Sequence, residues 1–247
     1  MPYGNPFDSD FRDSALILGS GPSVVAAREW DRKGFDHLVV LNNAWQVRPD
    51  WDDLIYPYDF PAERRPKELK AHQKYVTQED FVPIQNQYGG FVYAGGTMAF
   101  TAAYWVLGHY KPKHIAFLGC DMDYSGETTH FYGQGTADPL RDDITLMSLE
   151  AKANRFYAFA LEQGCRVTNL SQERSRLTFP RQTFGGPEPA PFTLDPDKIA
   201  QARMTEKRLS YFVPSGRYWE EQERFDVAEI KALDALWLEA VHLNGTS

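Results

Sequence analysis

The sequence has few cysteines and no long apolar run. Only Cys120 and Cys165 occur among its 247 residues, which is too few for a disulfide framework, and a reducing compartment is the simplest expectation. A helix that crosses a membrane needs about 18 consecutive apolar residues, and no such run is present, so no membrane span is expected. The polar, acidic start of the chain is unlike a secretory signal peptide. We therefore expect a cytoplasmic protein.

Several common catalytic motifs are also absent. The sequence has no HExxH motif or CxxC pair for zinc, no GxSxG nucleophile elbow and no Walker loop. Metalloprotease, zinc-finger, elbow-type hydrolase and P-loop functions are therefore unsupported. The net charge of −8 argues against a broad nucleic-acid surface, because such surfaces are basic, and leaves room only for a local basic groove.

What is present is an ordinary globular composition with a clear α/β pattern. The chain is 43% hydrophobic and 24% charged, as soluble domains usually are. Short apolar runs bounded by turn residues predict buried strands at residues 15–19, 38–42, 53–56, 114–119 and 166–170. Helices are expected between them at residues 22–31, 61–75, 97–108 and 146–163. This alternation predicts an open, doubly wound, mostly parallel α/β sheet of the Rossmann-like kind.

The composition changes after about residue 180. Residues 180–195 are rich in proline and glycine and read as a linker or wrapping arm. Apolar residues then recur at helical spacing from about 222 to 242. We expect a nucleotide-binding domain at 1–179, followed at 180–247 by an arm and a C-terminal helix that docks on the body or on a partner, including another copy of the chain in a homo-oligomer.

Polar residues follow the predicted strands where ligands of such sheets bind, beyond the carboxyl ends. Glycines there let a backbone approach a ligand, and the start of a helix offers free N–H groups to an anion. The candidates for nucleotide binding are Gly19, Ser20, Gly21, Pro22 and Ser23 after the first strand, Asn42 and Asn43 after the second, and Gly95, Gly96 and Thr97 before the buried helix. Each group also has a simpler explanation as a turn, a cap or a site of tight packing.

Chemistry is predicted mainly from the segment after the fourth strand. Asp121 and Asp123 have a D-x-D spacing that can hold Mg²⁺ or Mn²⁺. Tyr124 and His130 can hydrogen-bond a leaving phosphate, and His130 can move a proton. Arg174 can clamp an anionic donor, and Asp59, after the third strand, is a candidate base or a helix cap.

Aromatic residues make up 14% of the chain, and several lie near these predicted strand ends. Such rings suit stacking against a base or a sugar, or packing at the rim of the sheet. They are Trp45, Tyr56, Tyr58, Tyr93, Tyr124, Phe131 and Tyr132.

These segments together resemble a known family. The sequences GSGPS at 19–23, NNAW at 42–45 and the stretch 95–124 look like the bacterial Cst-type sialyltransferases of glycosyltransferase family forty-two, over about residues 14–170. The resemblance implies a CMP-sialic acid donor on a modified nucleotide-binding fold. It implies that Ser20–Ser23 lie near the nucleotide, that Asn43 contacts the donor and that Gly95 and Gly96 lie beside the cytidine. Tyr124 and His130 match the two tyrosines that hold the leaving phosphate.

The sequence also departs from that family. The family's general-base histidine follows the tyrosine pair, whereas residues 131–170 here contain no histidine, and an arginine that precedes the Ser-Gly pair is replaced by Val92 and Tyr93. The base would then be His130, Asp59 or Asp123. The start of the chain is also similar to uncharacterised bacteriophage proteins, which implies a host glycan or a modified base of phage DNA as acceptor.

The sequence therefore predicts a glycosyltransferase that uses a nucleotide sugar, with a CMP-sugar favoured, and leaves two alternatives open. The GSGPS turn and the D-x-D pair also resemble archaeal pterin pyrophosphokinase-like proteins, which transfer diphosphate from ATP with Mg²⁺. The other alternative is a non-catalytic phage or assembly protein on this fold.

Overall fold

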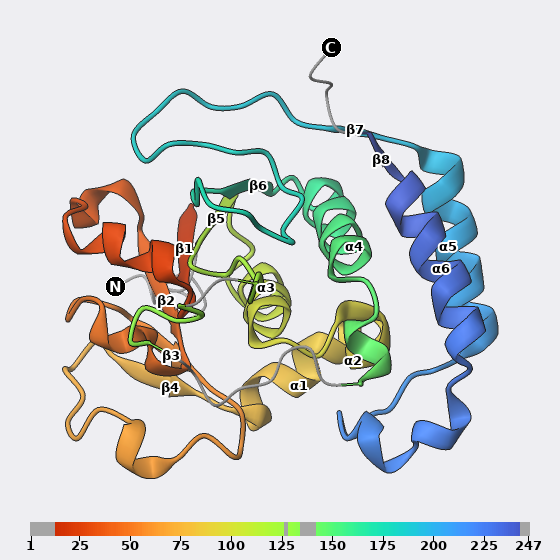
Figure 1. Cartoon of the computed structure of the whole chain (residues 1–247), viewed down its shortest axis with the longest axis horizontal. Helices are drawn as coiled ribbons and strands as arrows, with labels where there is room; N and C mark the ends of the chain where they lie inside the picture. The colour runs from red at the N-terminus through yellow and green to blue at the C-terminus, as the bar shows by residue number, and fades with distance from the viewer. Residues whose placement is uncertain (1–12, 126–127, 134–141, 243–247) are drawn as a thin grey trace, which may run out of the picture.

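The computed structural model describes residues 13–125, 128–133 and 142–242. Its centre is a sheet of six parallel strands in the order β4-β3-β2-β1-β5-β6 (Figure 1). This confirms the open parallel α/β sheet of the Rossmann-like kind. The strands are β1 Ser14–Leu18, β2 His37–Leu41, β3 Asp53–Ile55, β4 Lys74–Val76, β5 His114–Leu118 and β6 Arg166–Asn169.

Different elements cover the two faces of the sheet. Helices α3 (Met98–His109) and α4 (Leu149–Glu162) pack on the face that carries Ile17 and Phe117. The opposite face carries Leu16 and packs against short 3-10 helices. Successive strand residues point to opposite faces. Because both faces of β1 are covered, its residues Ala15–Leu18 are all apolar. The 3-10 helices that pack there are Pro22–Arg28 and Asn42–Gln46, whereas a third, Arg32–Gly34, buries none of its residues.

Two expected helices differ in the structure. The helix expected at 22–31 is a 3-10 helix of Pro22–Arg28, where two adjacent β-branched valines disfavour an α-helix. The helix expected at 61–75 is replaced by one 3-10 turn, Ala62–Arg64, and by β4. Pro66 lies inside the expected span and cannot donate the N–H that a helix interior needs. Helices α1 (Gln78–Gln87) and α2 (Phe91–Ala94) follow.

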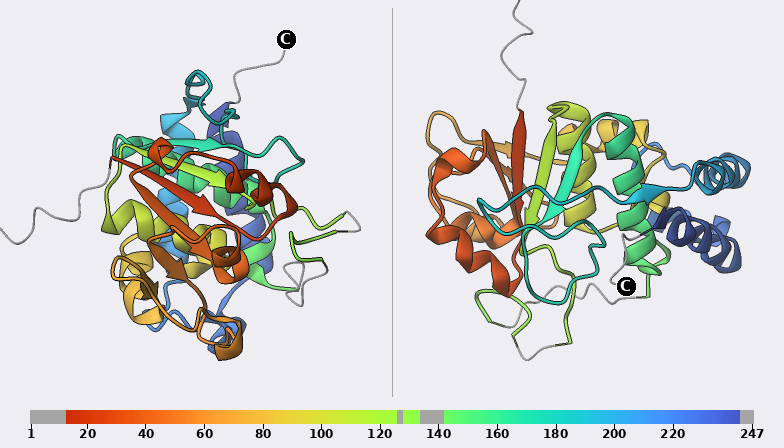
Figure 2. Two further views of the ribbon diagram at one scale, coloured as in Figure 1. Left: turned by 90° about the vertical axis from the view of Figure 1, so that its left-hand side faces the viewer. Right: turned by 90° about the horizontal axis from the view of Figure 1, so that it is seen from above.

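The C-terminal region forms a helical layer of its own. Helices α5 (Pro196–Leu209) and α6 (Val227–Glu239) pack on each other, and Figure 2 shows them on the far side of α4 from the sheet. Strands β7 (Thr193–Leu194) and β8 (Val241–His242) pair antiparallel where this region begins and ends. The helix expected at 222–242 is α6, whereas α5 was not expected, because it buries little apolar surface beyond Ile199 and Ala202.

Buried charges join this layer to α4. The ammonium of Lys152 lies 2.8 Å from Asp234, and the guanidinium of Arg155 lies 2.7 Å from Glu206. Both cations are almost inaccessible to solvent, so each needs its partner to offset the loss of hydration. The same surface of α4 also carries Asn154, whose amide donates to the Trp237 carbonyl at 3.1 Å, and apolar residues such as Ala151 and Ala158. The C-terminal helices are therefore held by burial, by a hydrogen bond and by matched charge. The predicted boundary near residue 180 stays a prediction. Within the described residues, no helix combines the length and apolar character that crossing a bilayer requires.

The closest backbone approach relevant to the site lies between the ends of β1 and β5. A Cβ atom on Gly19 would lie 2.2 Å from the carbonyl oxygen of Gly119, and one on Gly21 would lie 2.8 Å from the same atom. These distances leave no room for a side chain. The glycines of the GSGPS turn are therefore required by packing, whatever else the turn does.

Gly19→Ala is expected to lower the free energy of unfolding by about 3 kcal/mol, because two backbone segments would have to separate. Ser20→Ala, in the same turn, is the matched control and is expected to change it by less than about 0.5 kcal/mol. Urea denaturation of both variants measures the difference. Equal stability of the two variants would show that the close approach does not exist in solution.

Candidate active site

The candidate site lies where the sheet changes direction. The chain leaves β1 toward β2 on one side and later returns to place β5 on the other side, and ligands of open α/β sheets bind beyond the carboxyl ends of the strands at such a point. The Gly19 N–H donates to the Leu118 carbonyl at 2.8 Å, and the Gly21 N–H donates to the Gly119 carbonyl at 2.7 Å. The turns that follow β1 and β5 are thus held together by their backbones.

Asp121 is the buried charge at this point. The hydroxyls of Ser23 and Ser171 donate to its Oδ2 at 2.8 and 2.9 Å, so one carboxylate links the turns after β1, β5 and β6. The residue is 5% exposed, and within the described residues its Oδ1 is buried and has no hydrogen-bond partner. Leaving such an acceptor unpaired costs about 1–3 kcal/mol. A ligand that donates a hydrogen bond to Oδ1 would recover this energy.

The loop after β5 folds back over the turn after β1. The Phe131 N–H donates to the Ser20 carbonyl at 2.9 Å. This contact fixes His130 beside the turn, and the ring of His130 lies 6.0 Å from that of Tyr124 and 5.0 Å from that of Tyr132, centre to centre. The hydroxyl of Thr129 lies 2.9 Å from His130 Nδ1 and orients the imidazole. The structure therefore brings together Tyr124 and His130, while their roles toward a leaving phosphate stay predictions.

Burial sets the protonation of these two groups. It raises the pKa of Tyr124 to about 12, because the phenolate would lose its hydration. It lowers the pKa of His130 below the usual 6.5, because the imidazolium would lose its hydration as well. Near pH 7 the site thus holds a protonated phenol, which donates a hydrogen bond, and a neutral imidazole, which accepts a proton.

The D-x-D pair does not form a preformed cation site. Asp121 is engaged by two hydroxyls, while Asp123 accepts from the Ser125 N–H at 3.0 Å and lies 3.4 Å from the guanidinium of Arg174. These contacts lower the pKa of Asp123, and the hydrogen bonds from Ser125 contribute most. No cluster of three or more His, Cys, Asp or Glu side chains suited to a metal occurs among the described residues. Mg²⁺ or Mn²⁺ would have to draw Asp123 away from Arg174, whose side chain is exposed.

Asn42 and Asn43 begin the 3-10 helix that follows β2. Asn42 has a φ of 50°, in the left-handed region that asparagine tolerates better than most residues. Its Oδ1 is buried without a hydrogen-bond partner within the described residues. Asn43 is buried. The turn-forming explanation accounts for the backbone of Asn42 but leaves its amide oxygen available to a ligand.

Gly95, Gly96 and Thr97 lie at the start of α3 and have structural duties there. The side chain of Thr97 accepts from the Phe100 N–H at 3.3 Å and so caps the helix. A Cβ on Gly95 would lie 2.8 Å from the ring of Phe100. One on Gly96 would lie 2.5 Å from the hydroxyl of Thr145 and 2.7 Å from that of Tyr218. Close packing alone thus explains the glycines, and their predicted contact with a cytidine stays a prediction.

Asp59 is exposed in the loop after β3, next to exposed Tyr58, and within the part of the chain that the structure describes no contact ties it to Asp121 or His130. Sequence reasoning missed Ser171 and Tyr218. Ser171 stands two residues after β6, so its place after a strand was a usable signal. Tyr218 comes from the segment between α5 and α6, and no pattern in the sequence connects it to the start of α3.

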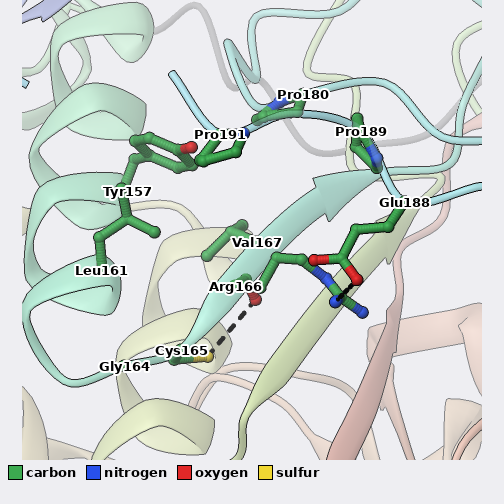
Figure 3. A pocket seen from close by; sticks show the side chains of 10 residues that line it. All are labelled: Tyr157, Leu161, Gly164, Cys165, Arg166, Val167, Pro180, Glu188, Pro189 and Pro191. Carbon is green, nitrogen blue, oxygen red and sulfur yellow. Dashed lines mark hydrogen bonds and ion pairs between the residues drawn. The ribbon is translucent and has the colours of Figure 1, made fainter. Parts of the chain in front are cut away.

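Two other features lie away from this edge. A pocket of about 220 Å³ lies between α4, β6 and the arm, lined by apolar residues such as Tyr157 and by the ion pair of Arg166 with Glu188 (Figure 3). It contains none of the candidate residues.

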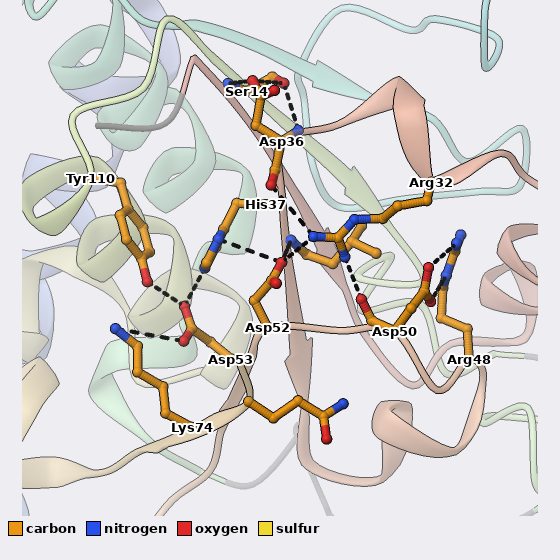
Figure 4. Close-up of polar contacts among 12 residues, drawn as sticks. Ser14, Arg32, Asp36, His37, Arg48, Asp50, Asp52, Asp53, Lys74 and Tyr110 are labelled. Carbon is orange, nitrogen blue, oxygen red and sulfur yellow. Dashed lines mark hydrogen bonds and ion pairs between the residues drawn. The ribbon is translucent and has the colours of Figure 1, made fainter. Parts of the chain in front are cut away.

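A buried polar cluster lies at the amino ends of β2 and β3. There, His37 Nε2 lies 2.6 Å from Asp53, which also accepts from the Tyr110 hydroxyl at 2.7 Å (Figure 4). This cluster is buried at the opposite edge of the sheet and ties strands together.

Asp121→Ala is expected to lower the free energy of unfolding by about 1–3 kcal/mol, because the hydroxyls of Ser23 and Ser171 lose their acceptor. Asp123→Ala is the control and is expected to cost less than about 1 kcal/mol, since its ion pair is exposed. Chemical denaturation measures both. A loss at Asp121 no larger than that at Asp123 would contradict its role as the link between three turns.

A scan against protein-family models and searches of curated proteins and of solved structures found no match. The functional argument therefore depends on the geometry of the site and on the resemblance described from the sequence.

Proposed function

We propose that the chain is a glycosyltransferase that takes a sugar from a nucleotide-sugar donor, with a CMP-sugar favoured, and delivers it to a hydroxyl of a glycan or of a modified nucleobase. The observation that carries this proposal is the convergence of Asp121, Tyr124 and His130 beside the turn of Gly19–Ser23, at the change of direction of a parallel sheet. This is the place where such sheets bind nucleotides.

Charge separates the roles of these groups. A phosphate is repelled by the carboxylate of Asp121, so Oδ1 suits a hydroxyl of the ribose or of the transferred sugar, which donates a hydrogen bond. The phosphate is then stabilised by the phenol of Tyr124, which its raised pKa keeps protonated. The backbone N–H groups of Ser20 and Ser23 are the candidates from the turn, since those of Gly19 and Gly21 already donate to carbonyls and Pro22 has none. Asn43, buried after β2, is the candidate contact with the base or ribose.

The proposed chemistry needs one proton acceptor. The oxygen of the acceptor hydroxyl bonds to the anomeric carbon, the bond from that carbon to the phosphate oxygen breaks, and its electron pair leaves with the phosphate. The hydroxyl proton passes to His130, which is neutral near pH 7 because burial lowers its pKa. Preorganised donors at the departing phosphate stabilise the charge that develops there. Asp59 and Asp123 are alternative bases that the variants below distinguish.

The pyrophosphokinase-like alternative requires a cation held by Asp121 and Asp123. Both carboxylates are engaged with other groups, so the geometry favours the transferase. A strict requirement for Mg²⁺ together with ATP turnover would support the alternative instead.

Nucleotide binding is the first test. CMP, UDP and GDP are titrated with and without Mg²⁺, and a nucleotide present at about 100 times its dissociation constant should stabilise the protein by about 2.7 kcal/mol. We expect CMP to raise the melting temperature most. Tyr124→Phe should weaken CMP binding by about tenfold, because it removes a hydrogen bond to a charged group, whereas Tyr132→Phe, on the same loop, should not. Failure of every nucleotide to bind would overturn the proposal.

The pH dependence tests the base. The release of CMP from CMP-sialic acid should fall as the pH drops below 6.5, because the pKa of His130 is lowered and the imidazole loses its basic form only on that side. His130→Gln should lower kcat by about 10²- to 10⁴-fold and remove this acidic limb. Asp59→Asn and Asp123→Asn serve as comparisons. If His130→Gln keeps both the rate and the pH profile, while Asp59→Asn or Asp123→Asn loses them, the base is the aspartate whose substitution abolishes them.

A further inference from the structure

The segment between α5 and α6 reaches the region where α3 begins. The Tyr218 hydroxyl donates to Asp143 at 2.8 Å and lies 3.5 Å from that of Thr145, and these contacts bring it against Gly96. The next residue, Trp219, lies beside Tyr58 from the end of β3, with ring centres 6.2 Å apart and ring planes 23° apart. In Figure 1 the loop after β3 and the segment between α5 and α6 both lie at the lower end of the molecule.

Both rings keep much of their surface in water. Tyr58 is 66% exposed and Trp219 is 44% exposed. Their stacking on each other contributes only about 0.5–1.5 kcal/mol beyond the area that they bury. Folding therefore leaves an aromatic surface wider than one ring. Exposed apolar surface of this kind, rimmed by polar groups, marks binding sites.

Buried residues anchor the backbone on which the two rings stand. In the sequence, Tyr58 stands between Tyr56 and Phe60, which are both buried and whose rings contact each other with centres 5.6 Å apart. Trp219 follows the buried Tyr218, and the turn before it is fixed by the Asn86 amide, which donates to the Pro214 carbonyl at 2.8 Å. The backbone that carries the pair is thus anchored, and the two rings contact each other, so a ligand that stacks on them loses less free energy to ordering than it would on two separate side chains.

The charges around the pair indicate which ligand it suits. Arg217 lies 3.5 Å from Glu220, and Arg224 pairs with Glu221. Arg65 is placed over the ring of Tyr56, 4.5 Å from its centre, and donates to the Phe60 carbonyl at 2.6 Å. The ion pairs of Arg217 and Arg224 are exposed and weak, and Arg64 and Lys67 on the segment after Tyr58 are exposed as well. The carboxylates of Asp59, Glu220 and Glu221 adjoin the two rings in the sequence and repel phosphates, whereas nucleic-acid binding needs a surplus of cations.

We propose that Tyr58 and Trp219 form a platform for the apolar face of a sugar ring in a glycan acceptor, with the exposed carboxylate of Asp59 available to its hydroxyls. The C-terminal region would then complete the site instead of only packing on the body. This inference rests on the proposed function and selects a glycan over a modified nucleobase as acceptor.

The first experiment measures binding of the full chain to an array of bacterial and animal glycans, followed by calorimetry with the best-bound glycan. Trp219→Ala and Tyr58→Ala should each weaken that binding by about tenfold. Trp219→Phe and Tyr58→Phe keep a ring and should stay within about threefold of the native protein. Met204→Ala, which removes an exposed side chain of α5, is the matched control.

Each outcome decides the proposal. If no glycan binds, or if the alanine variants bind as the native protein does, the platform is refuted. Binding to an oligothymidine of twenty nucleotides serves as the comparison. If the native protein binds it and no glycan, and the alanine variants lose that binding, the acceptor is a nucleic acid and the glycan platform is refuted as well. CMP binding should be unchanged in Trp219→Ala. Glycan binding that depends on the pair in a protein that binds no nucleotide would refute the proposed function and leave the platform standing.

Discussion

The site depends on one steric constraint, which is the contact between the backbone turns that follow β1 and β5. Gly19 and Gly21 approach the carbonyl of Gly119 so closely that no side chain fits between them. Because the turns touch, the hydroxyl of Ser23 reaches the carboxylate of Asp121, and the loop after β5 can fold back to bond to Ser20. The positions of Tyr124 and His130 follow from that return of the chain.

A second level of organisation comes from buried polarity. Asp121 draws three turns together at the carboxyl edge, while Lys152 and Arg155 attach the C-terminal helices to α4 through Asp234 and Glu206. Buried charges of this kind hold only where their partners are in place. They therefore fix how the C-terminal region sits on the body and, through it, the place of Tyr218 against Gly96 at the start of α3 and of Trp219 beside Tyr58.

Much of the sheet could be predicted from the sequence, because strands buried on both faces are short apolar runs. β4 was missed because its three residues carry no such run. Helix α5 was missed because it is highly charged and buries only Ile199 and Ala202, so its apolar residues recur too seldom to mark a helical face. At the site, the sequence placed Asp121, Tyr124 and His130 on one loop. It offered tight packing as one explanation of the glycines near residues 19 and 96 but could not decide for it, and it could not reveal that Tyr218 lies against Gly96, since both are consequences of contacts between distant segments.

The most direct test of the central claim is a crystal structure of the protein with CMP bound at saturating concentration. We expect the nucleotide at the change of direction of the sheet, with its phosphate near the Tyr124 hydroxyl and a ribose hydroxyl donating to Asp121 Oδ1. Density for CMP in the pocket between α4, β6 and the arm, with the turn of Gly19–Ser23 empty, would contradict the account.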